Sequence, residues 1–408
     1  MLIESIVRKT LGLKRHCVKK VLEDEQNLVV YLIPDNRFKL ICSCCNAKGP
    51  GYDTLKERRW KHVPLWGIPV ILVYAPRRVE CVSCGVKVEA IPWTQGKSPL
   101  SLPLSMVLAT WARLVAWKVV GQLFGFHWNT VHKAVKDVVD YGLDNRNLHE
   151  ILYIGIDEIS RKKGHVYHTQ VYDLTKKKLL WSGEDRTSET LETFFDYLGE
   201  DCCQKIKAVC CDMWAPYTKT IKKRLPNALL VFDKFHIIRH LMGAVDQVRK
   251  EEAQKLNPDN PDLLKGTRYI WLKNPWNLTE KQKTRLSDLE KLNLKINRAY
   301  LLKEAFRKLW DYTYPAWAKK YLDQWFWWAT HSRLETMRKF AWMIRRHQED
   351  ILNYFKVRID NGAVEGLNNK AKSISHRAYG YRSAETFKLA LYHTMGDLPV
   401  PKLTHKFV

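Results

Sequence analysis

Short apolar runs that end on acidic residues recur in the middle of the chain. Residues 151–160 read ILYIGIDEIS, and residues 207–214 read KAVCCDMW. Runs of this length that are rich in apolar, β-branched and aromatic residues predict buried strands. The sequence therefore predicts one strand that stops at Asp157 and another that stops at Asp212. Each aspartate alone could simply cap a following turn or helix.

Further elements are predicted around these two runs. The pattern predicts strands at 165–173, 178–182 and 228–232, and helices at 188–198, capped by Ser188, and around 216–224. Strands and helices that alternate in this way, with acids at the strand ends, indicate a mixed α/β arrangement.

The region before residue 150 has a different pattern. A β-like run at 67–74 is followed by a linker of turn formers at 92–102 and by helical spacing over 104–141 with one break at 125–127. Residues 117–139 fit a helix-turn-helix whose second helix opens at Trp128. That helix would expose four side chains to a DNA major groove: Asn129, His132, Lys133 and Lys136. An ordinary pair of packed helices would show the same spacing.

The stretch from 237 to about 358 is helical in pattern, basic and rich in Trp. We expect most of these Trp side chains to pack in a helical core, although Trp325, Trp327 and Trp328 could stack on an unpaired base. A later helix starting near Ala363 places Glu365, Asn369 and Lys372 on one face. These side chains could together bind a metal, a phosphate and a DNA backbone. The same pattern also occurs on an ordinary solvent-exposed helix face.

Length and charge narrow the class of protein. The 408 residues predict several domains. A net charge of +25 favours a polyanionic partner, with nucleic acid ahead of an anionic membrane surface. No 18-residue apolar run is present, and residues 1–16 carry charges where a signal peptide needs an apolar core. We therefore expect a soluble intracellular protein, in which cysteines bind metal or are buried rather than form disulfides.

Two metal sites follow from the residue types. Cys42, Cys45, Cys81 and Cys84 form two C-x-x-C knuckles, the tetrahedral sulfur set that structural Zn²⁺ prefers, with Cys44 and His62 as possible substitutes. Basic residues around them suit phosphate contacts or a solvated face. Two strands that each bring an aspartate to one sheet edge supply oxygen ligands for Mg²⁺.

The order and wording of several boxes carry a resemblance to a known family. After the two knuckles come WNTV, IGIDEIS, CDMWAPY, VFDKFH, NGAVEGLNNKAK and RAYGYR. Over essentially its whole length the chain resembles a DDE transposase of bacterial insertion sequences, specifically of the ISL-three family. The resemblance implies a multidomain α/β protein with an RNase H-like catalytic core that an all-helical insertion interrupts. The expected domains are a zinc-binding ribbon-like domain at 1–95, a helix-turn-helix domain at 100–145, the first part of the core at 150–236, the helical insertion at 237–358 and the last part of the core at 359–395.

The resemblance also assigns roles. It implies a catalytic triad of Asp157, Asp212 and Glu365 that binds Mg²⁺ or Mn²⁺. Asp233 and His236 resemble a D-x-x-H box that supports the triad or positions DNA. Lys372 and Arg377 are candidates for binding the phosphate or the strand beside it. Glu158 would point away from Asp157 on an extended strand, so we leave it out of the triad.

The implied function is DNA transposition. Such a protein binds the terminal inverted repeats of its element, cuts at the element ends with divalent metal and joins the 3′-OH ends to target DNA. The expected partners are double-stranded DNA and further copies of the chain, in a homodimer or larger synaptic complex, in the bacterial cytoplasm at the nucleoid. The alternatives are a sequence-specific DNA-binding protein that has lost catalysis and another RNase H-like nuclease. The three acids argue against the first alternative, and the two DNA-recognition modules argue against the second.

Overall fold

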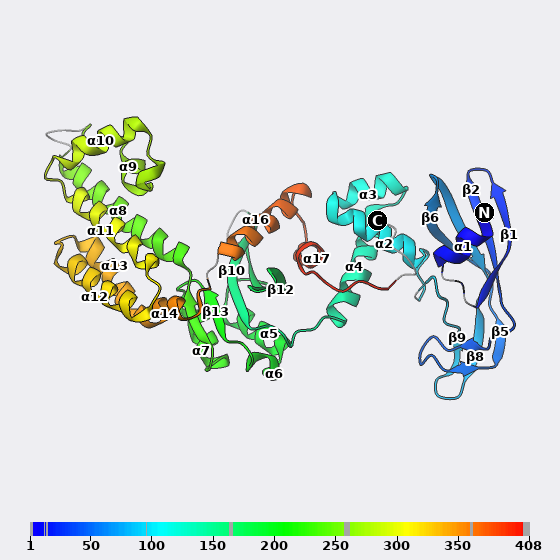
Figure 1. The fold of residues 1–408 in the computed structure, drawn as a ribbon. Helices are drawn as coiled ribbons and strands as arrows, with labels where there is room; N and C mark the ends of the chain where they lie inside the picture. Colours follow the sequence, from blue (N-terminus) through cyan, green and yellow to red (C-terminus); the bar gives the residue numbers. More distant parts are fainter. Residues whose placement is uncertain are drawn as a thin grey trace. The chain divides into compact units, whose positions relative to one another are not determined.

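The computed structural model describes residues 3–11, 13, 15–94, 96–162, 166–256, 262–359 and 362–402 (Figure 1). The chain divides into two compact units. One comprises Met1–Arg146, Arg377–Tyr379 and Tyr392–Val408, and the other comprises Asn147–His376 and Gly380–Leu391. No helix in the described part of the chain is long and apolar enough to span a membrane.

The first unit begins with helix α1 (Ile3–Leu11) and a four-stranded sheet. The strand order is β1 (His16–Asp24), β2 (Asn27–Pro34), β7 (Ile68–Tyr74) and β6 (Arg58–Leu65), and only β2 and β7 are parallel. Its core contains Trp60, Leu72 and Trp93. Trp93 lies in the predicted linker 92–102, of which Gln95 is outside the described residues, so this segment is packed into the sheet's core rather than extended through solvent.

Two small sheets carry the four cysteines of the C-x-x-C knuckles. One pairs β3 (Leu40–Ile41) with β4 (Lys48–Gly49), and the other has the order β5 (Gly51–Thr54), β8 (Arg77–Cys81) and β9 (Gly85–Val88). The cysteines therefore lie at strand ends and in the turns that follow them.

Three helices follow: α2 (Leu102–Leu114), α3 (Trp117–Phe124) and α4 (Trp128–Asp144). The predicted helix, short turn and second helix opening at Trp128 are present. The prediction of a single break is wrong, because Val115 and Ala116 are extended and separate α2 from α3. Gly125 ends α3 with φ of 67°, which glycine adopts without strain. A Cβ on Gly121 would lie 2.5 Å from the Phe126 carbonyl oxygen, so the tight turn requires glycine there as well.

The second unit is built on a five-stranded sheet with the order β12 (Lys178–Glu184), β11 (Val166–Asp173), β10 (Tyr153–Lys162), β13 (Ala208–Cys211) and β14 (Leu229–Phe232). The first three strands are antiparallel neighbours, and β10, β13 and β14 are parallel. All five predicted strands are present, although His165 lies outside the described residues. The predicted end of the first strand at Asp157 is wrong, because β10 continues to Lys162 in its pairing with β11.

Helices α5 (Ser188–Leu198), α6 (Glu200–Cys203) and α7 (Ala215–Arg224) connect the strands. The cap of α5 is Thr187 rather than the predicted Ser188, since the Thr187 side chain accepts a hydrogen bond from the Thr190 N–H at 3.1 Å.

The stretch after β14 is helical, as predicted. It contains α8 (Lys234–Leu256), α9 (Arg268–Leu272), α10 (Glu280–Glu290), α11 (Lys295–Arg307), α12 (Pro315–His331), α13 (Glu335–Arg346), α14 (Gln348–Leu352) and α15 (Tyr354–Val357). Helices α16 (Gly362–Arg377) and α17 (Ala384–Met395) follow. One continuous cluster of buried side chains extends from Ile151, which precedes β10 in the sequence, to Phe355 in α15. The sheet and the helical region therefore share a core.

The expectation that most Trp side chains of this region are buried is wrong. Trp271, Trp310 and Trp325 are buried, whereas Trp276, Trp317, Trp327, Trp328 and Trp342 are exposed. The amphipathic geometry of α12 explains part of this, because its buried face carries Ala318, Leu322, Trp325 and Ala329.

Candidate functional site

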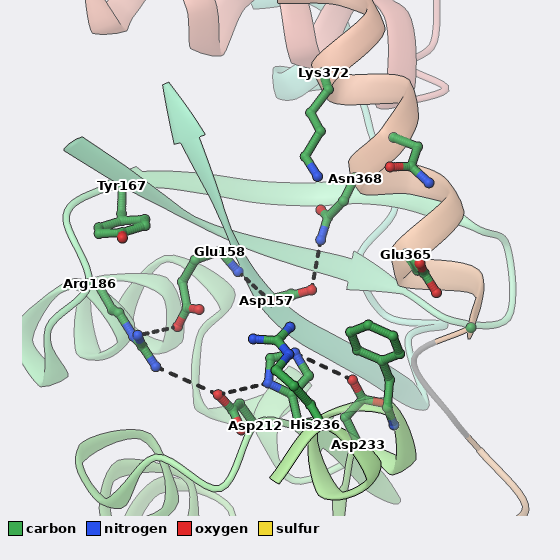
Figure 2. Close-up of a pocket in the computed structure, with 14 residues that line it drawn as sticks. Asp157, Glu158, Tyr167, Arg186, Asp212, Asp233, His236, Glu365, Asn368 and Lys372 are labelled. Carbon is green, nitrogen blue, oxygen red and sulfur yellow. Dashed lines mark hydrogen bonds and ion pairs between the residues drawn. The ribbon is translucent and has the colours of Figure 1, made fainter. Parts of the chain in front are cut away.

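Three carboxylates gather at one edge of the five-stranded sheet (Figure 2). Strand β13 pairs with β10 only as far as Gly155, so β10 has no neighbour on this side at Asp157. Asp212 follows β13 directly, and Asp233 follows β14. Adjacent parallel strands of different length thus place all three side chains in one pocket.

Helix α16 supplies the other wall of this pocket. Glu365, Asn368, Asn369 and Lys372 lie on its pocket face, in agreement with the predicted helical spacing. Asp360 and Asn361, which precede α16, lie outside the described residues. The charged side chains that line the pocket are Asp157, Glu158, Asp212, Asp233 and Glu365, with Arg186, His236, Arg239 and Lys372. The predicted triad residues therefore line a single site.

Asp157 is held on both carboxylate oxygens. Its Oδ1 accepts a hydrogen bond from the Glu158 N–H at 2.8 Å, and its Oδ2 accepts one from the Asn368 Nδ2 at 2.7 Å. Asn368 is itself fixed by the Tyr172 hydroxyl, which donates to its Oδ1 at 2.7 Å. Burial raises the pKa of Asp157, and these hydrogen bonds partly oppose that effect. Asn368 was not among the predicted site residues, although it lies one turn from Glu365 on the same face of α16.

Asp212 is charged and paired. Its Oδ2 lies 3.0 Å from His236 Nδ1, and its Oδ1 accepts a hydrogen bond from the Met213 N–H at 2.6 Å. Burial raises the pKa of Asp212, but the contact with His236 lowers the pKa by a larger amount, so the net shift is downward. The pKa of His236 is raised, because the Asp212 and Asp233 carboxylates outweigh its burial. His236 Nε2 is 3.6 Å from Asp233, whose pKa burial raises to about 6.

Glu158 is placed differently from our expectation. It lines the same pocket as Asp157, where its carboxylate forms an ion pair with Arg186 at 2.9 Å. Strand β13 stops pairing with β10 at Gly155, so no described strand covers that edge of β10 at Glu158. Arg186 lies over the Trp214 ring at 4.6 Å and also approaches Asp212 at 3.7 Å. Burial raises the pKa of Glu158 to about 7.

Of the two cations predicted to bind phosphate, Lys372 lines the pocket and Arg377 does not. The Arg377 guanidinium donates to the backbone carbonyl of Arg113 in α2. The predicted role of Arg377 receives no support from this contact.

The pocket suits a hard divalent cation. Asp157, Asp212 and Glu365 present carboxylate oxygens from three separate segments, which is the ligand type that Mg²⁺ and Mn²⁺ prefer. Glu365 is exposed on the first turn of α16. The neighbouring Arg186 and His236 compensate the negative charge of Asp212.

The four knuckle cysteines form a second cluster. The sulfur atoms of Cys42, Cys45, Cys81 and Cys84 all lie within 4.8 Å of one another, close to the ~3.8 Å edge of a tetrahedron of Zn–S bonds. The Cys45 and Cys44 backbone N–H groups lower the pKa of Cys42 to about 7, which favours the thiolate. Cys44 is exposed and outside the cluster, and His62 is outside it as well, hydrogen-bonded to the Ser101 hydroxyl at 2.8 Å. The four predicted ligands therefore fit zinc without a substitute.

Backbone geometry supports both knuckles. Asn46 and Gly85 each follow the second cysteine of a knuckle, with φ of 59° and 69°. This left-handed conformation is one that Asn and Gly tolerate.

The predicted DNA-facing residues lie along α4. Asn129, Lys133 and Lys136 are exposed, whereas His132 is half-buried. The His132 ring lies edge-on to Trp117 at 5.6 Å and to Trp128 at 6.1 Å, so it braces the two helices. Lys136 forms an ion pair with Asp140 at 2.9 Å.

Comparisons with known proteins show which proteins this chain is similar to. A model of ISL3-type proteins, described as "Transposase", matches residues 154–391, and a "zinc-finger of transposase IS204/IS1001/IS1096/IS1165" matches residues 40–84. The transposase for insertion sequence element IS1001 of Bordetella parapertussis is 30% identical over 370 residues, which is 90% of this chain and 91% of that protein. The transposase for insertion sequence element IS1557 of Mycobacterium tuberculosis is 27% identical over 427 residues, 97% of this chain and 96% of that protein.

Proposed function

The chain belongs to the ISL-three family of transposases, enzymes that act on DNA, and from this premise we propose how its pockets serve transposition. The protein binds the terminal inverted repeats of an insertion sequence, cuts at the element ends and joins the 3′-OH ends to target DNA. The observation that carries this proposal is the single pocket that Asp157, Asp212 and Glu365 all line.

These three carboxylates would hold the divalent metal. When bound, Mg²⁺ or Mn²⁺ polarises the scissile phosphate and favours deprotonation of the attacking water or 3′-OH. The chain's own residues orient the ligands: Asn368 holds Asp157, and His236 with Arg186 holds Asp212. Lys372 is placed to neutralise a phosphate at the pocket wall. Cleavage and strand transfer would use this one site with different nucleophiles.

The catalytic part is proposed to be an RNase H-like core. Support comes from the strand order β12-β11-β10-β13-β14, with an antiparallel set of three followed by two parallel strands. The helical segment 237–358 would be an insertion between β14 and the helix that carries Glu365. The remaining proposed domains are 1–95, 100–145, 150–236 and 359–395.

DNA recognition is assigned to the N-terminal unit. Asn129, Lys133 and Lys136 are exposed on α4 and would read or contact the terminal repeat, with His132 as a brace. Zinc on the four cysteines would stabilise the adjoining small sheets. Both element ends have to be held together, so a homodimer or larger synaptic complex would act at the nucleoid.

Cleavage of a labelled DNA end tests the proposal. The substrate is a duplex with the sequence that flanks this reading frame, incubated with Mg²⁺ or with Ca²⁺. The wild type should cut at the element boundary with Mg²⁺ only, and Asp212→Asn should lower the rate by more than about 100-fold. Asp201→Asn, an exposed aspartate on α6, is the matched control.

The outcomes separate the alternatives. Binding without cutting by the wild type would favour a DNA-binding protein without catalysis. Cutting that ignores the terminal sequence would favour another RNase H-like nuclease. Cutting that survives Asp212→Asn would place the active site elsewhere.

A further inference from the structure

We propose that Phe235 and Arg239 form a stacking platform for an unpaired DNA base next to the scissile phosphate. This inference rests on the proposed function, and it adds a nucleobase-binding site to the carboxylate pocket. Both residues line that pocket, and neither belongs to the predicted catalytic or supporting set.

Phe235 is an exposed aromatic side chain in a polar pocket. It is 52% exposed, whereas Ile237 and Leu241 on the core face of the same helix are fully buried. Its ring therefore contributes little to the hydrophobic core, since it has kept much of its apolar surface in water. A flat apolar surface that is accessible beside a DNA-cutting site suits the face of a base.

The backbone of Phe235 is fixed by the site itself. Its N–H donates to the Asp233 Oδ1 at 3.1 Å, which anchors the first turn of α8. The next residue, His236, contacts Asp212 at 3.0 Å. A base on the Phe235 ring would therefore be held in a defined position relative to Asp212.

Arg239 completes the platform one helical turn later. Its guanidinium carbon lies over the Phe235 ring, 5.2 Å from the ring centroid, so it backs one face of the ring. Within the described residues, Arg239 forms no ion pair with a carboxylate. Its charge is thus available for the phosphate attached to a base that stacks on the other face of the ring.

The depth of the carboxylates explains why the base would be unpaired. The side chains of Glu158, Asp212 and Asp233 are only 10%, 19% and 6% exposed, whereas Phe235 is 52% exposed. A phosphate that reaches these recessed groups has to leave the regular path of the duplex backbone. The neighbouring base then loses its pairing partner, and stacking on an aromatic ring compensates for part of that loss.

The exposed Trp side chains of the helical region are weaker candidates for this role. Trp317, Trp327, Trp328 and Trp342 are exposed, but none of them lines the carboxylate pocket. The Trp327 ring is already stacked on His331 at 4.4 Å.

A double-mutant cycle that combines protein substitutions with abasic DNA tests the platform. Binding of a fluorescently labelled terminal duplex is measured by anisotropy with Ca²⁺ in place of Mg²⁺, and the DNA is recovered afterwards to verify that it is uncut. Single abasic nucleotides are introduced, one at a time, at the four positions on each side of the cleaved bond. The proteins are the full-length wild type, Phe235→Ala, Phe235→Trp and Tyr269→Ala.

On intact DNA, Phe235→Ala should weaken binding by about 5- to 150-fold, the range for loss of one base–aromatic stack. On the DNA that lacks the stacked base, wild type and Phe235→Ala should bind equally. Phe235→Trp should bind intact DNA as the wild type does, which shows that the ring and not the fold is responsible. Tyr269→Ala is the matched control, because Tyr269 is 59% exposed with Arg268 at 5.7 Å from its ring but lies outside the pocket.

Two results would overturn the inference. One is that Phe235→Ala binds intact DNA as tightly as the wild type does. The other is that Phe235→Ala binds every abasic duplex more weakly than the wild type by the same factor as intact DNA. Failure of the proposed function is read separately, from the wild type with Mg²⁺ on intact DNA. Suppose that the wild type cuts at the element boundary while the effects of Phe235→Ala and of each abasic nucleotide on binding simply add. In that case the transposase proposal stands and the platform is refuted.

Discussion

Asn368 shows at the scale of a single residue how a candidate metal ligand is held in place. It donates to Asp157 and accepts from Tyr172, so a buried hydroxyl, an amide and a carboxylate form a chain across the pocket wall. Groups that orient a ligand in this way affect metal binding nearly as strongly as the ligands themselves.

Replacing Asn368 should therefore weaken metal binding. For Asn368→Ala we expect the Mn²⁺ concentration that gives half-maximal cleavage to rise about 10- to 100-fold. Tyr172→Phe should have a smaller effect in the same direction, because Asn368 keeps its bond to Asp157. Cleavage is measured across a Mn²⁺ titration, and an unchanged midpoint for Asn368→Ala would show that Asp157 is oriented by other groups.

His168 predicts a pH dependence of stability. It is fully buried on β11 with its ring edge-on to Phe387 at 5.4 Å, and neither ring nitrogen has a hydrogen-bond partner among the described residues. Burial, with smaller effects from Arg161 and Lys388, lowers its pKa to about 4. Between pH 6.5 and 4 the unfolded chain binds more protons than the folded one, so the free energy of unfolding falls as the pH is lowered.

The size of this effect is about 2 kcal/mol between pH 6.5 and 5. His168→Leu should remove it, so that the variant loses less stability on acidification than the wild type does. Urea unfolding at pH 7 and pH 5 measures the difference. Equal losses for both proteins would mean that His168 is not buried as a neutral ring.

At the scale of elements, the two cysteine knuckles depend on the turns that follow β3 and β8. Their short strands bury few apolar side chains, namely Cys42, Val79 and Cys81. A core of this size stabilises a fold weakly, so bound zinc would supply much of the stability of these sheets.

Removing one ligand should therefore release zinc. We expect Cys84→Ser to lose the zinc that metal analysis detects in the wild type and to unfold at a lower temperature. Cys44→Ser is the matched control and should keep its zinc, since Cys44 lies outside the cluster. Full zinc content in Cys84→Ser would contradict the four-cysteine assignment.

The proposed DNA contacts of helix α4 are of two kinds, one to phosphate and one to bases. Lys133→Gln should weaken binding to all DNA sequences and lower the slope of log K against log salt by about 1, as expected for one lost phosphate contact. Asn129→Ala should lower the preference for terminal-repeat DNA by about 5- to 150-fold and leave that slope unchanged. Anisotropy titrations at several salt concentrations distinguish the two, and a preserved preference in Asn129→Ala would exclude it from base reading.

The elements that sequence reasoning could place are those with a local signal. Short apolar runs predicted the strand that carries Asp157 and the strand that Asp212 follows, and helical spacing predicted the face of Glu365 and Lys372. The position of Glu158 was missed, because it depends on where the neighbouring β13 stops pairing. Arg186 and Asn368 were missed because the residues that they contact are distant in the sequence.

At the scale of the whole molecule, the pocket is assembled from segments far apart along the chain. Asn368 and Asp157 are separated by 211 positions, and the helical region lies between them in the sequence. The sheet and that region share one continuous core. Asn368 ties α16 to the sheet through Asp157 and Tyr172, so the pocket forms only when these distant segments have folded together. No local pattern could establish that Glu365 lines the same pocket as the two aspartates.

The most direct measurement of the central claim is therefore strand transfer by Glu365→Gln. Pre-cut terminal DNA with free 3′-OH ends is incubated with a supercoiled target plasmid and Mg²⁺, and joined products are counted on a gel. If one pocket performs both steps, Glu365→Gln should fail to join these ends and also fail to cut intact ends, while it still binds them. Glu385→Gln, an exposed glutamate outside the pocket, should do both. Joined products from Glu365→Gln at the wild-type rate would contradict the account and remove α16 from the metal site.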